Sequence, residues 1–217
     1  MPDFNRIKTA LYCGKPDRVP LAEGWIDSQI KAKLLGEKHD PAQKGTLQEA
    51  EYNVRFWCMA GYDYIHVHED TKQLFAMQKE QMGPRNWIDT REASIQSLKD
   101  IETYPWPDAE EYDFSLLCET SKKLPDGMKI ISGTAGIFET VWMLLGFERF
   151  SPAFIDEPEL IELMFEKVGS VVYRVFERIL EFDNIGALWY YDDITCKSGP
   201  MVSPRYIREY SNKMQWI

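Results

Sequence analysis

The spacing of apolar residues along the chain predicts six helices. In the longest of them Leu160, Met164 and Val168 recur every four residues, and Asp156 stands where an N-cap would lie. A stripe of this period buries one face of a helix against a core and leaves the other face to water. The six predicted helices span residues 28–35, 46–60, 107–123, 137–145 and about 156–181, and the last opens at Ser203–Pro204.

Start and stop signals fix several of these boundaries. Thr46 and Glu49 form a capping box, in which two side chains accept hydrogen bonds from two free backbone N–H groups. The helix that they open is predicted to stop at Gly61, and the helix before it at Gly36, because glycine readily adopts the left-handed conformation. Ser203–Pro204 supplies an N-cap followed by a proline, which suits the first turn of a helix.

Four short segments between these helices predict strands: the first is an extended run opened by Pro20, and the others contain β-branched and aromatic residues. They lie at residues 19–25, 62–68, 129–132 and 185–191. Strands that alternate with helices pair in parallel through right-handed crossovers, and this order predicts an α/β fold with four β/α units. A chain of 217 residues is expected to form a single domain.

Composition and charge exclude several classes of function. Hydrophobic residues make up 44% and charged residues 28%, as in an ordinary globular protein. Lys and Arg number 25 against 35 Asp and Glu, and the net charge of −10 repels nucleic-acid backbones and anionic lipid. We find no apolar run of the ~20 residues that cross a bilayer and no secretory signal. The dispersed cysteines, Cys13, Cys58, Cys118 and Cys196, are typical of reduced thiols. We therefore expect a cytoplasmic protein with neither nucleic-acid nor membrane partners.

Polar or glycine-rich residues follow each predicted strand. In parallel α/β folds ligands bind at the carboxyl ends of the strands, because loops and helix N-termini converge there. The candidate site residues taken from these ends are Trp25, His66, His68, Glu139, Tyr190, Asp192, Asp193 and Lys197. We expect Asp192 and Asp193 to line one cleft together with His66 or His68.

The acidic candidates have two interpretations. Adjacent carboxylates at Asp192 and Asp193 can raise one pKa for acid–base catalysis or hold a substrate donor. They can equally form a polar strand end that caps neighbouring amides. The segment Gly133–Gly136 could cradle an anion with its N–H groups, although close packing of strand and helix explains two glycines as well. Glu139, in an otherwise apolar first turn, needs a partner if it is buried.

The aromatic and imidazole candidates are ambiguous in the same way. His66 and His68 lie two residues apart on a predicted strand, so both side chains point to one face. Two imidazoles can ligate a metal, but zinc needs three or four ligands, and packing or ligand contact is favoured. Trp25, Trp189 and Tyr190 are typical of a core more than of a cofactor contact.

Several stretches resemble the uroporphyrinogen decarboxylase superfamily, in particular its cobalamin-dependent methyltransferase-like branch. They are Pro16–Pro20, Gly61–Asp63, Gly133–Glu139 with Leu145–Phe147, and Trp189–Ile194 followed by Lys197–Pro204. The resemblance implies a TIM-barrel-type (β/α)8 fold of which this chain carries about four of eight units, the N-terminal half. It also implies action on tetrapyrroles or methyl-corrinoids.

The sequence departs from the family pattern in two places, and both departures argue against decarboxylation of a porphyrinogen. Decarboxylases of the family carry an arginine-rich segment that holds the substrate's carboxylates, whereas this chain has the acidic segment Leu21–Asp27. The decarboxylase tyrosine also lacks a clear counterpart within Glu139–Met143. The methyltransferases bind zinc through the second half of the barrel, so we expect no tightly bound zinc here, and a corrinoid only as substrate or methyl donor.

The resulting hypothesis is a methyltransferase-like domain that acts on a small molecule or a corrinoid protein. The resemblance and the strand-end rule together make Asp192, Asp193 and Glu139 the catalytic candidates. The ligand-binding candidates are Trp25, His66, His68, Tyr190 and Lys197. The alternatives are a truncated or non-catalytic binding protein of the same fold and a decarboxylase with a diverged substrate. Open barrel edges are expected to favour self-association.

Overall fold

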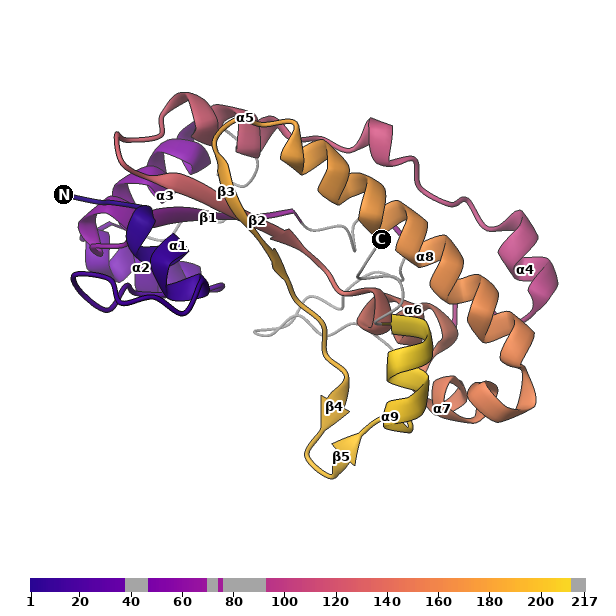
Figure 1. Ribbon diagram of the computed structural model, residues 1–217. Coiled ribbons are helices and arrows are strands. Elements are labelled where there is room, and N and C mark those ends of the chain that lie inside the picture. The colour runs from indigo at the N-terminus through magenta and orange to yellow at the C-terminus, as the bar shows by residue number, and fades with distance from the viewer. Residues whose placement is uncertain (38–46, 70–73, 76–92, 212–217) are drawn as a thin grey trace. The chain divides into compact units, whose positions relative to one another are not determined.

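The computed structural model describes residues 1–37, 47–69, 74–75 and 93–211 (Figure 1). The chain forms two compact units, and it passes between them five times. Unit 1 consists of Met1–Glu69, Asp113–Gly133 and Arg178–Trp189, and unit 2 consists of Asp70–Tyr112, Thr134–Glu177 and Tyr190–Ile217. Neither unit is therefore a continuous stretch of sequence.

Unit 1 contains a three-stranded parallel sheet, whose second and third strands each end with one residue of unit 2. The strands are β1 (Tyr64–Glu69), β2 (Lys129–Thr134) and β3 (Ile185–Tyr190), in the order β1-β2-β3. Helices α1 (Asn5–Leu11), α2 (Ser28–Leu35), α3 (Leu47–Met59) and α5 (Ser115–Lys122) belong to the same unit. Helix α3 packs against both α5 and β1 (Figure 1). The predicted α/β class is confirmed.

Several predicted boundaries in unit 1 are confirmed. Helix α2 begins after Asp27, whose carboxylate accepts a hydrogen bond from the backbone N–H of Gln29 at 2.8 Å, and it ends at Gly36 in the left-handed conformation. Gly61, between α3 and β1, also has a positive φ. Thr46 and its capping box lie outside the described residues. Gly127 forms the turn before β2, where a Cβ atom would lie 2.4 Å from the carbonyl oxygen of Pro2.

A buried carboxylate explains two of the stretches that resemble the decarboxylase superfamily. The side chain of Asp63 is fully buried, and its two oxygens accept from Arg6 Nη1 at 2.8 Å and Arg18 Nη2 at 2.6 Å. The backbone N–H of Asp3 donates to the same carboxylate at 2.9 Å. Arg6 also pairs with Asp17 at 2.7 Å. These residues fasten the N-terminal segment to the start of β1, which is a structural role.

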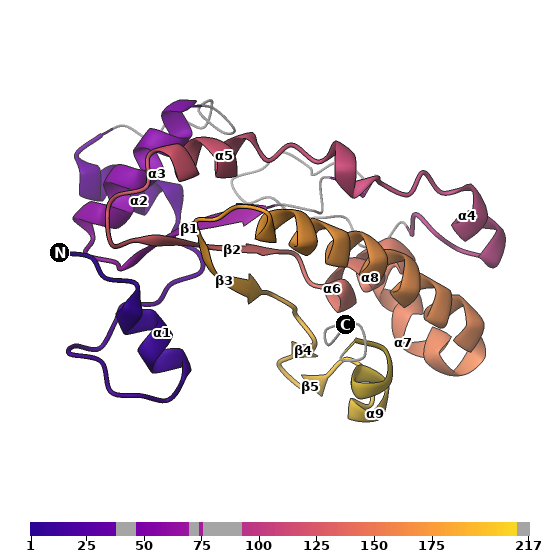
Figure 2. The same ribbon diagram turned by 45° about the horizontal axis from the view of Figure 1, so that its top comes forward.

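Unit 2 is mainly helical. Its elements are α4 (Leu98–Thr103), the 3₁₀ helix η3 (Ala109–Glu111), α6 (Ile137–Leu145), α7 (Phe147–Asp156), most of α8 (Pro158–Leu180), the antiparallel pair β4 (Thr195–Cys196) and β5 (Gly199–Pro200), α9 (Pro204–Tyr206) and the π-helix η4 (Ile207–Ser211). Helices α6, α7 and α8 lie side by side in both views (Figures 1 and 2). Phe138, Phe150 and Phe165 are fully buried between them, with Phe138 and Phe150 edge to face at 4.9 Å.

The strand predicted at residues 19–25 is wrong. This segment has no strand partner, and three strands, not four, form the main sheet in the described part of the chain. Tyr64 satisfies the backbone there instead: its hydroxyl accepts from the N–H of Glu23 at 2.6 Å and donates to the carbonyl of Glu23 at 2.7 Å. Pro20 has no N–H to offer a neighbouring strand.

Two predicted helices are broken in the structure. The helix predicted at 107–123 is interrupted at Tyr112, which has extended backbone, and it restarts where Asp113 accepts from the N–H of Ser115 at 2.9 Å. The helix predicted from 156 is preceded by α7, which we did not predict. Asp156 ends α7 and does not cap α8, because Pro158 disfavours helical backbone at Glu157.

The remaining predicted elements are confirmed with shifts of a few residues. The segments predicted at 62–68, 129–132 and 185–191 form β1, β2 and β3, and 137–145 forms α6. Ser203 caps α9, with Pro204 in its first turn. Among the described residues, we find no helix with the length and apolar character needed to cross a bilayer.

Candidate functional site

The predicted site residues fall into two groups. Unit 1 contains Trp25, His66 and His68. Unit 2 contains Glu139, Tyr190, Asp192, Asp193 and Lys197. Within each unit the structure brings several of them into contact. A common cleft for the aspartates and the histidines stays a prediction.

The group in unit 1 is a cluster of indole and imidazole rings. His66 and His68 lie on one face of β1, as predicted, with ring centroids 6.3 Å apart and planes 16° from parallel. Trp25 meets His68 edge-on at 5.8 Å, and Trp189 meets His66 edge-on at 6.1 Å. Trp57 of α3 lies 6.3 Å from His66. We call these five residues the histidine–tryptophan cluster. Trp25 is 74% exposed, so the expectation that it belongs to a core is wrong, and its indole offers a flat face to a ligand.

The environment of His66 keeps its imidazole neutral. Its side chain is buried, and burial, together with the nearby charges of His68 and Lys31, lowers its pKa to about 3. A neutral imidazole can donate and accept hydrogen bonds at physiological pH. Among the residues that the structure describes, no three His, Cys, Asp or Glu side chains are grouped to hold a metal ion. The expectation of no tightly bound zinc stays a prediction.

Lys31 adjoins this cluster, and the sequence analysis missed it. Its ammonium donates to Asn53 Oδ1 at 2.9 Å and lies over the rings of Phe56 and Trp57, at 5.5 and 5.6 Å from their centroids. Burial lowers the pKa of Lys31. The sequence carried no clear signal for Lys31: the apolar residues Ile30 and Leu34 of α2 are exposed, and the structure alone shows that Lys31 lies on the less exposed face beside Ala32.

In unit 2, Asp192 caps helix α6 from a distant part of the chain. Its Oδ2 atom accepts from the N–H of Phe138 at 3.0 Å, and its Oδ1 atom accepts from the N–H of Glu139 at 2.8 Å. Tyr190 donates its hydroxyl proton to the same carboxylate at 2.6 Å and accepts from the N–H of Ile137 at 2.9 Å. Three N–H groups at the start of α6 are thereby satisfied.

Gly136 makes room for this carboxylate. A Cβ atom at residue 136 would lie 2.2 Å from Cγ and Oδ1 of Asp192 and 2.4 Å from the carbonyl oxygen of Tyr191. The N–H groups that bind the Asp192 carboxylate belong to Phe138 and Glu139, after the segment Gly133–Gly136, so an anion cradle formed by that segment stays a prediction. These hydrogen bonds match the interpretation of Asp192 as a cap for neighbouring amides. Burial raises the pKa of Asp192, although the hydrogen bond from Tyr190 opposes the shift.

The other candidates of unit 2 are more open to solvent. Asp193 and Lys197 are exposed, and Asp193 Oδ1 accepts from the N–H of Thr195 at 3.4 Å. Glu139 is half-buried. The neighbouring Cys196 thiol is also exposed, and its hydrogen bond with the Ser198 hydroxyl lowers its pKa. The two adjacent aspartates thus differ: Asp192 is a half-buried cap, and Asp193 faces water.

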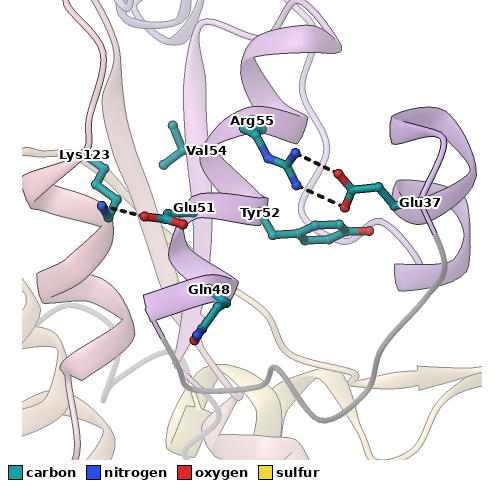
Figure 3. Close-up of a pocket in the computed structure, with 7 residues that line it drawn as sticks. All are labelled: Glu37, Gln48, Glu51, Tyr52, Val54, Arg55 and Lys123. Atoms are coloured by element: carbon teal, nitrogen blue, oxygen red, sulfur yellow. Dashed lines mark hydrogen bonds and ion pairs between the residues drawn. The ribbon is translucent and has the colours of Figure 1, made fainter.

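The surface hollow of unit 1 shown in Figure 3 does not coincide with the predicted site. It has a volume of about 540 Å³ and lies over α3, with one residue from α5's C-terminal end and one that follows α2. Its lining residues are Glu37, Gln48, Glu51, Tyr52, Val54, Arg55 and Lys123 (Figure 3). Arg55 pairs with Glu37 at 2.7 Å and Lys123 with Glu51 at 3.0 Å. Because these charges cancel in pairs, the hollow presents no unbalanced charge to a ligand.

Comparison with known proteins identifies a similar fold. No protein-family model matches the chain, and no curated protein matches it. Among solved structures, a methyltransferase from Methanosarcina mazei is similar, with a TM-score of 0.73 and 14% sequence identity. The match covers 96% of this chain and 64% of the methyltransferase. The chain thus has an α/β fold like that of an archaeal methyltransferase and spans just under two thirds of its length.

Proposed function

We propose that this chain is a methyltransferase-like domain of the uroporphyrinogen decarboxylase superfamily. It supplies the first part of a (β/α)8 barrel and binds a corrinoid or a related tetrapyrrole. The observation that carries the proposal is the TM-score of 0.73 to a methyltransferase over 96% of the chain. The order of the superfamily-like stretches, from Pro16–Pro20 to Lys197–Pro204, supports the same assignment.

The residues of unit 1 suit contact with a flat macrocycle. The exposed indole of Trp25 and the stacked imidazoles of His66 and His68 offer adjacent ring faces. The corrinoid would supply the methyl group, and these side chains would orient the ring system beside them. The described residues do not offer three metal ligands in one place, so no role is assigned to zinc.

The candidate residues of unit 2 are suited to polar contact with a ligand and to holding the start of α6 in place. Asp193 and Lys197 are exposed after β3, where a ligand can reach them. Asp192 and Tyr190 hold the start of α6, and this positions Glu139 in its first turn. In this proposal Asp193 and Glu139 hold or move a proton, while Asp192 supports them.

Titration with methylcobalamin tests the proposal. We expect saturable quenching of tryptophan fluorescence and a weaker response in Trp25→Ala, because the exposed indole is removed without loss of core packing. Tyr12→Ala is the matched control, since Tyr12 follows α1, is 80% exposed and lies outside the cluster. Absence of saturable binding, or equal binding by Trp25→Ala, would contradict the proposed ligand.

A non-catalytic binding protein of the same fold is the second candidate. The observation in its favour is that Asp192, one of the catalytic candidates, is engaged as the cap of α6. The two candidates differ in turnover. Binding of methylcobalamin without transfer of its methyl group to a thiol acceptor would favour the binding protein, and methyl transfer would favour the enzyme.

The sheet of unit 1 also suggests a partner. In the described part of the chain β1 and β3 are its outer strands, and Leu188 of β3 is 39% exposed. Outer strands with free N–H and C=O groups pair readily with further strands. We propose self-association through such an edge. Light scattering after size exclusion should show a mass that rises with concentration, and a monomer with a sharp cooperative melt would contradict it.

A further inference from the structure

The ammonium of Lys31 is held without a carboxylate. Asn53 Oδ1, 2.9 Å away, is a neutral acceptor, and the rings of Phe56 and Trp57 hold the cation only through their π-faces. Among the described residues, none forms an ion pair with Lys31 within 4 Å; Glu49 acts on it only at longer range. A half-buried cation with such partners keeps its attraction for an anion.

A second N–H donor belongs to the same aromatic surface. The Trp57 side chain is 1% exposed, and its Nε1 atom has no hydrogen-bond acceptor among the described residues. Lys31 lies over this indole ring. Buried N–H groups are nearly always paired, so a missing acceptor beside a cation indicates that a negatively charged oxygen binds there.

Flat surfaces continue from Trp57 toward solvent. His66 lies 6.3 Å from Trp57, His68 lies 6.3 Å from His66, and Trp25 lies 5.8 Å from His68. Lys31 and His68 are half-buried, whereas Trp25 is exposed. The cluster is thus open to solvent at Trp25 and His68, whereas Trp57 is buried and is adjoined by the half-buried cation of Lys31.

We propose that Lys31 and Trp57 form an oxyanion-binding site in unit 1, which takes the carboxylate or phosphate group of a ligand whose flat ring lies against His66 and His68. This site goes beyond the proposed function, because it does not depend on methyl transfer or on a corrinoid. The neutral state of the His66 imidazole leaves Lys31 as the cation that selects the charge of the ligand.

Three small aromatic probes test the site. Benzoate and phenyl phosphate carry the two oxyanions on the same ring, and benzamide is the neutral control. We expect benzoate and phenyl phosphate to quench tryptophan fluorescence saturably and benzamide to bind at least tenfold more weakly. The tighter of the two anions identifies the natural anionic group as carboxylate or phosphate. Equal binding of benzamide would overturn the proposal.

Variants of α2 locate the site. Lys31→Met keeps the side-chain stem but removes the charge, and we expect it to weaken benzoate binding at least tenfold. Lys31→Arg should retain binding. Lys33→Met changes an exposed lysine of the same helix and should leave binding within twofold of wild type. Wild-type affinity in Lys31→Met would overturn the proposal.

A measurement on the wild-type protein covers the case in which Lys31→Met does not fold. Benzoate should slow the acetylation of Lys31 by acetic anhydride and leave the acetylation of Lys33 unchanged, as followed by peptide mass spectrometry. Equal rates at Lys31 with and without benzoate would overturn the proposal.

Discussion

Two carboxylates, the buried Asp63 of unit 1 and the half-buried Asp192 of unit 2, are stabilised in contrasting ways. Asp63 is held by two guanidinium groups, those of Arg6 and Arg18. Among the described residues, Asp192 is held by dipoles: the hydroxyl of Tyr190 and two backbone N–H groups at the start of α6. Ion pairing compensates directly for the loss of water around a charge, whereas dipoles compensate in part. Asp63 therefore holds two segments of the fold together, whereas the charge of Asp192 depends more strongly on its surroundings.

The largest expected effect concerns the ion-paired carboxylate. Asp63→Ala leaves two arginines without their shared partner, and removal of one member of a buried pair costs about 3–5 kcal/mol. Urea denaturation should show this loss in the free energy of unfolding. Asp17→Ala, which removes a largely exposed partner of Arg6, is the control and should change stability little. A small loss of stability in Asp63→Ala would show that ion pairing does not stabilise Asp63 more than dipoles stabilise Asp192.

The next effect concerns the space beside Asp192. In Gly136→Ala the new methyl group would overlap the carboxylate and the Tyr191 carbonyl, and overpacking of this kind costs about 1–3 kcal/mol. Thermal and urea unfolding measure the loss. The double variant Gly136→Ala with Asp192→Ala should lose less than the sum of the two single changes, because part of the overlap is gone. Strict additivity would contradict the close approach.

A smaller effect is the pH dependence that Asp192 confers. Its pKa in the folded protein is raised above the ordinary 3.8, so the folded state holds the proton more tightly than the unfolded state. Stability from this group is greatest at low pH and is lost as the pH rises from 3.8 through the raised pKa. The unfolding free energy of wild type minus that of Asp192→Asn should therefore fall as the pH rises from 3.8 through the raised pKa. A rising difference would show that hydrogen bonds outweigh burial at this carboxylate.

The smallest effect on stability is expected at Asp193. This side chain is exposed, so Asp193→Asn should melt close to the wild-type temperature. It should nevertheless weaken the binding of methylcobalamin, if the exposed aspartate is the one that contacts a ligand. A large loss of stability with unchanged binding would make Asp193 a structural residue like its neighbour.

Much of the fold could be predicted from local patterns, but its long-range contacts could not. The dense β-branched and aromatic residues of 62–68, 129–132 and 185–191 indicated β1, β2 and β3 correctly. Residues 19–25 were assigned to a strand from an extended run that Pro20 opens, yet they form no strand, because Pro20 offers no N–H and the hydroxyl of Tyr64 satisfies both backbone groups of Glu23. Pro158 was a sequence signal for the break between α7 and α8. The prediction overlooked this break, because it followed the periodicity of the apolar residues alone.

The candidate site shows the same limit. That His66 and His68 share a face follows from their spacing of two residues. The role of Asp192 depends on N–H groups more than fifty positions away in the sequence, which a local pattern does not reveal. Lys31 could not be singled out from the sequence, because its partners Asn53 and Trp57 come from another helix.

The interleaving of the two units has a consequence for synthesis on the ribosome. Unit 1 includes Arg178–Trp189, and β3 with it, so its sheet lacks a strand until most of the chain has been made. Unit 2 needs residues that follow Tyr190. A nascent chain that carries only β1 and β2 must wait with apolar surface uncovered, and contacts between distant segments form slowly. Neither unit can therefore complete its folding from the first two thirds of this sequence.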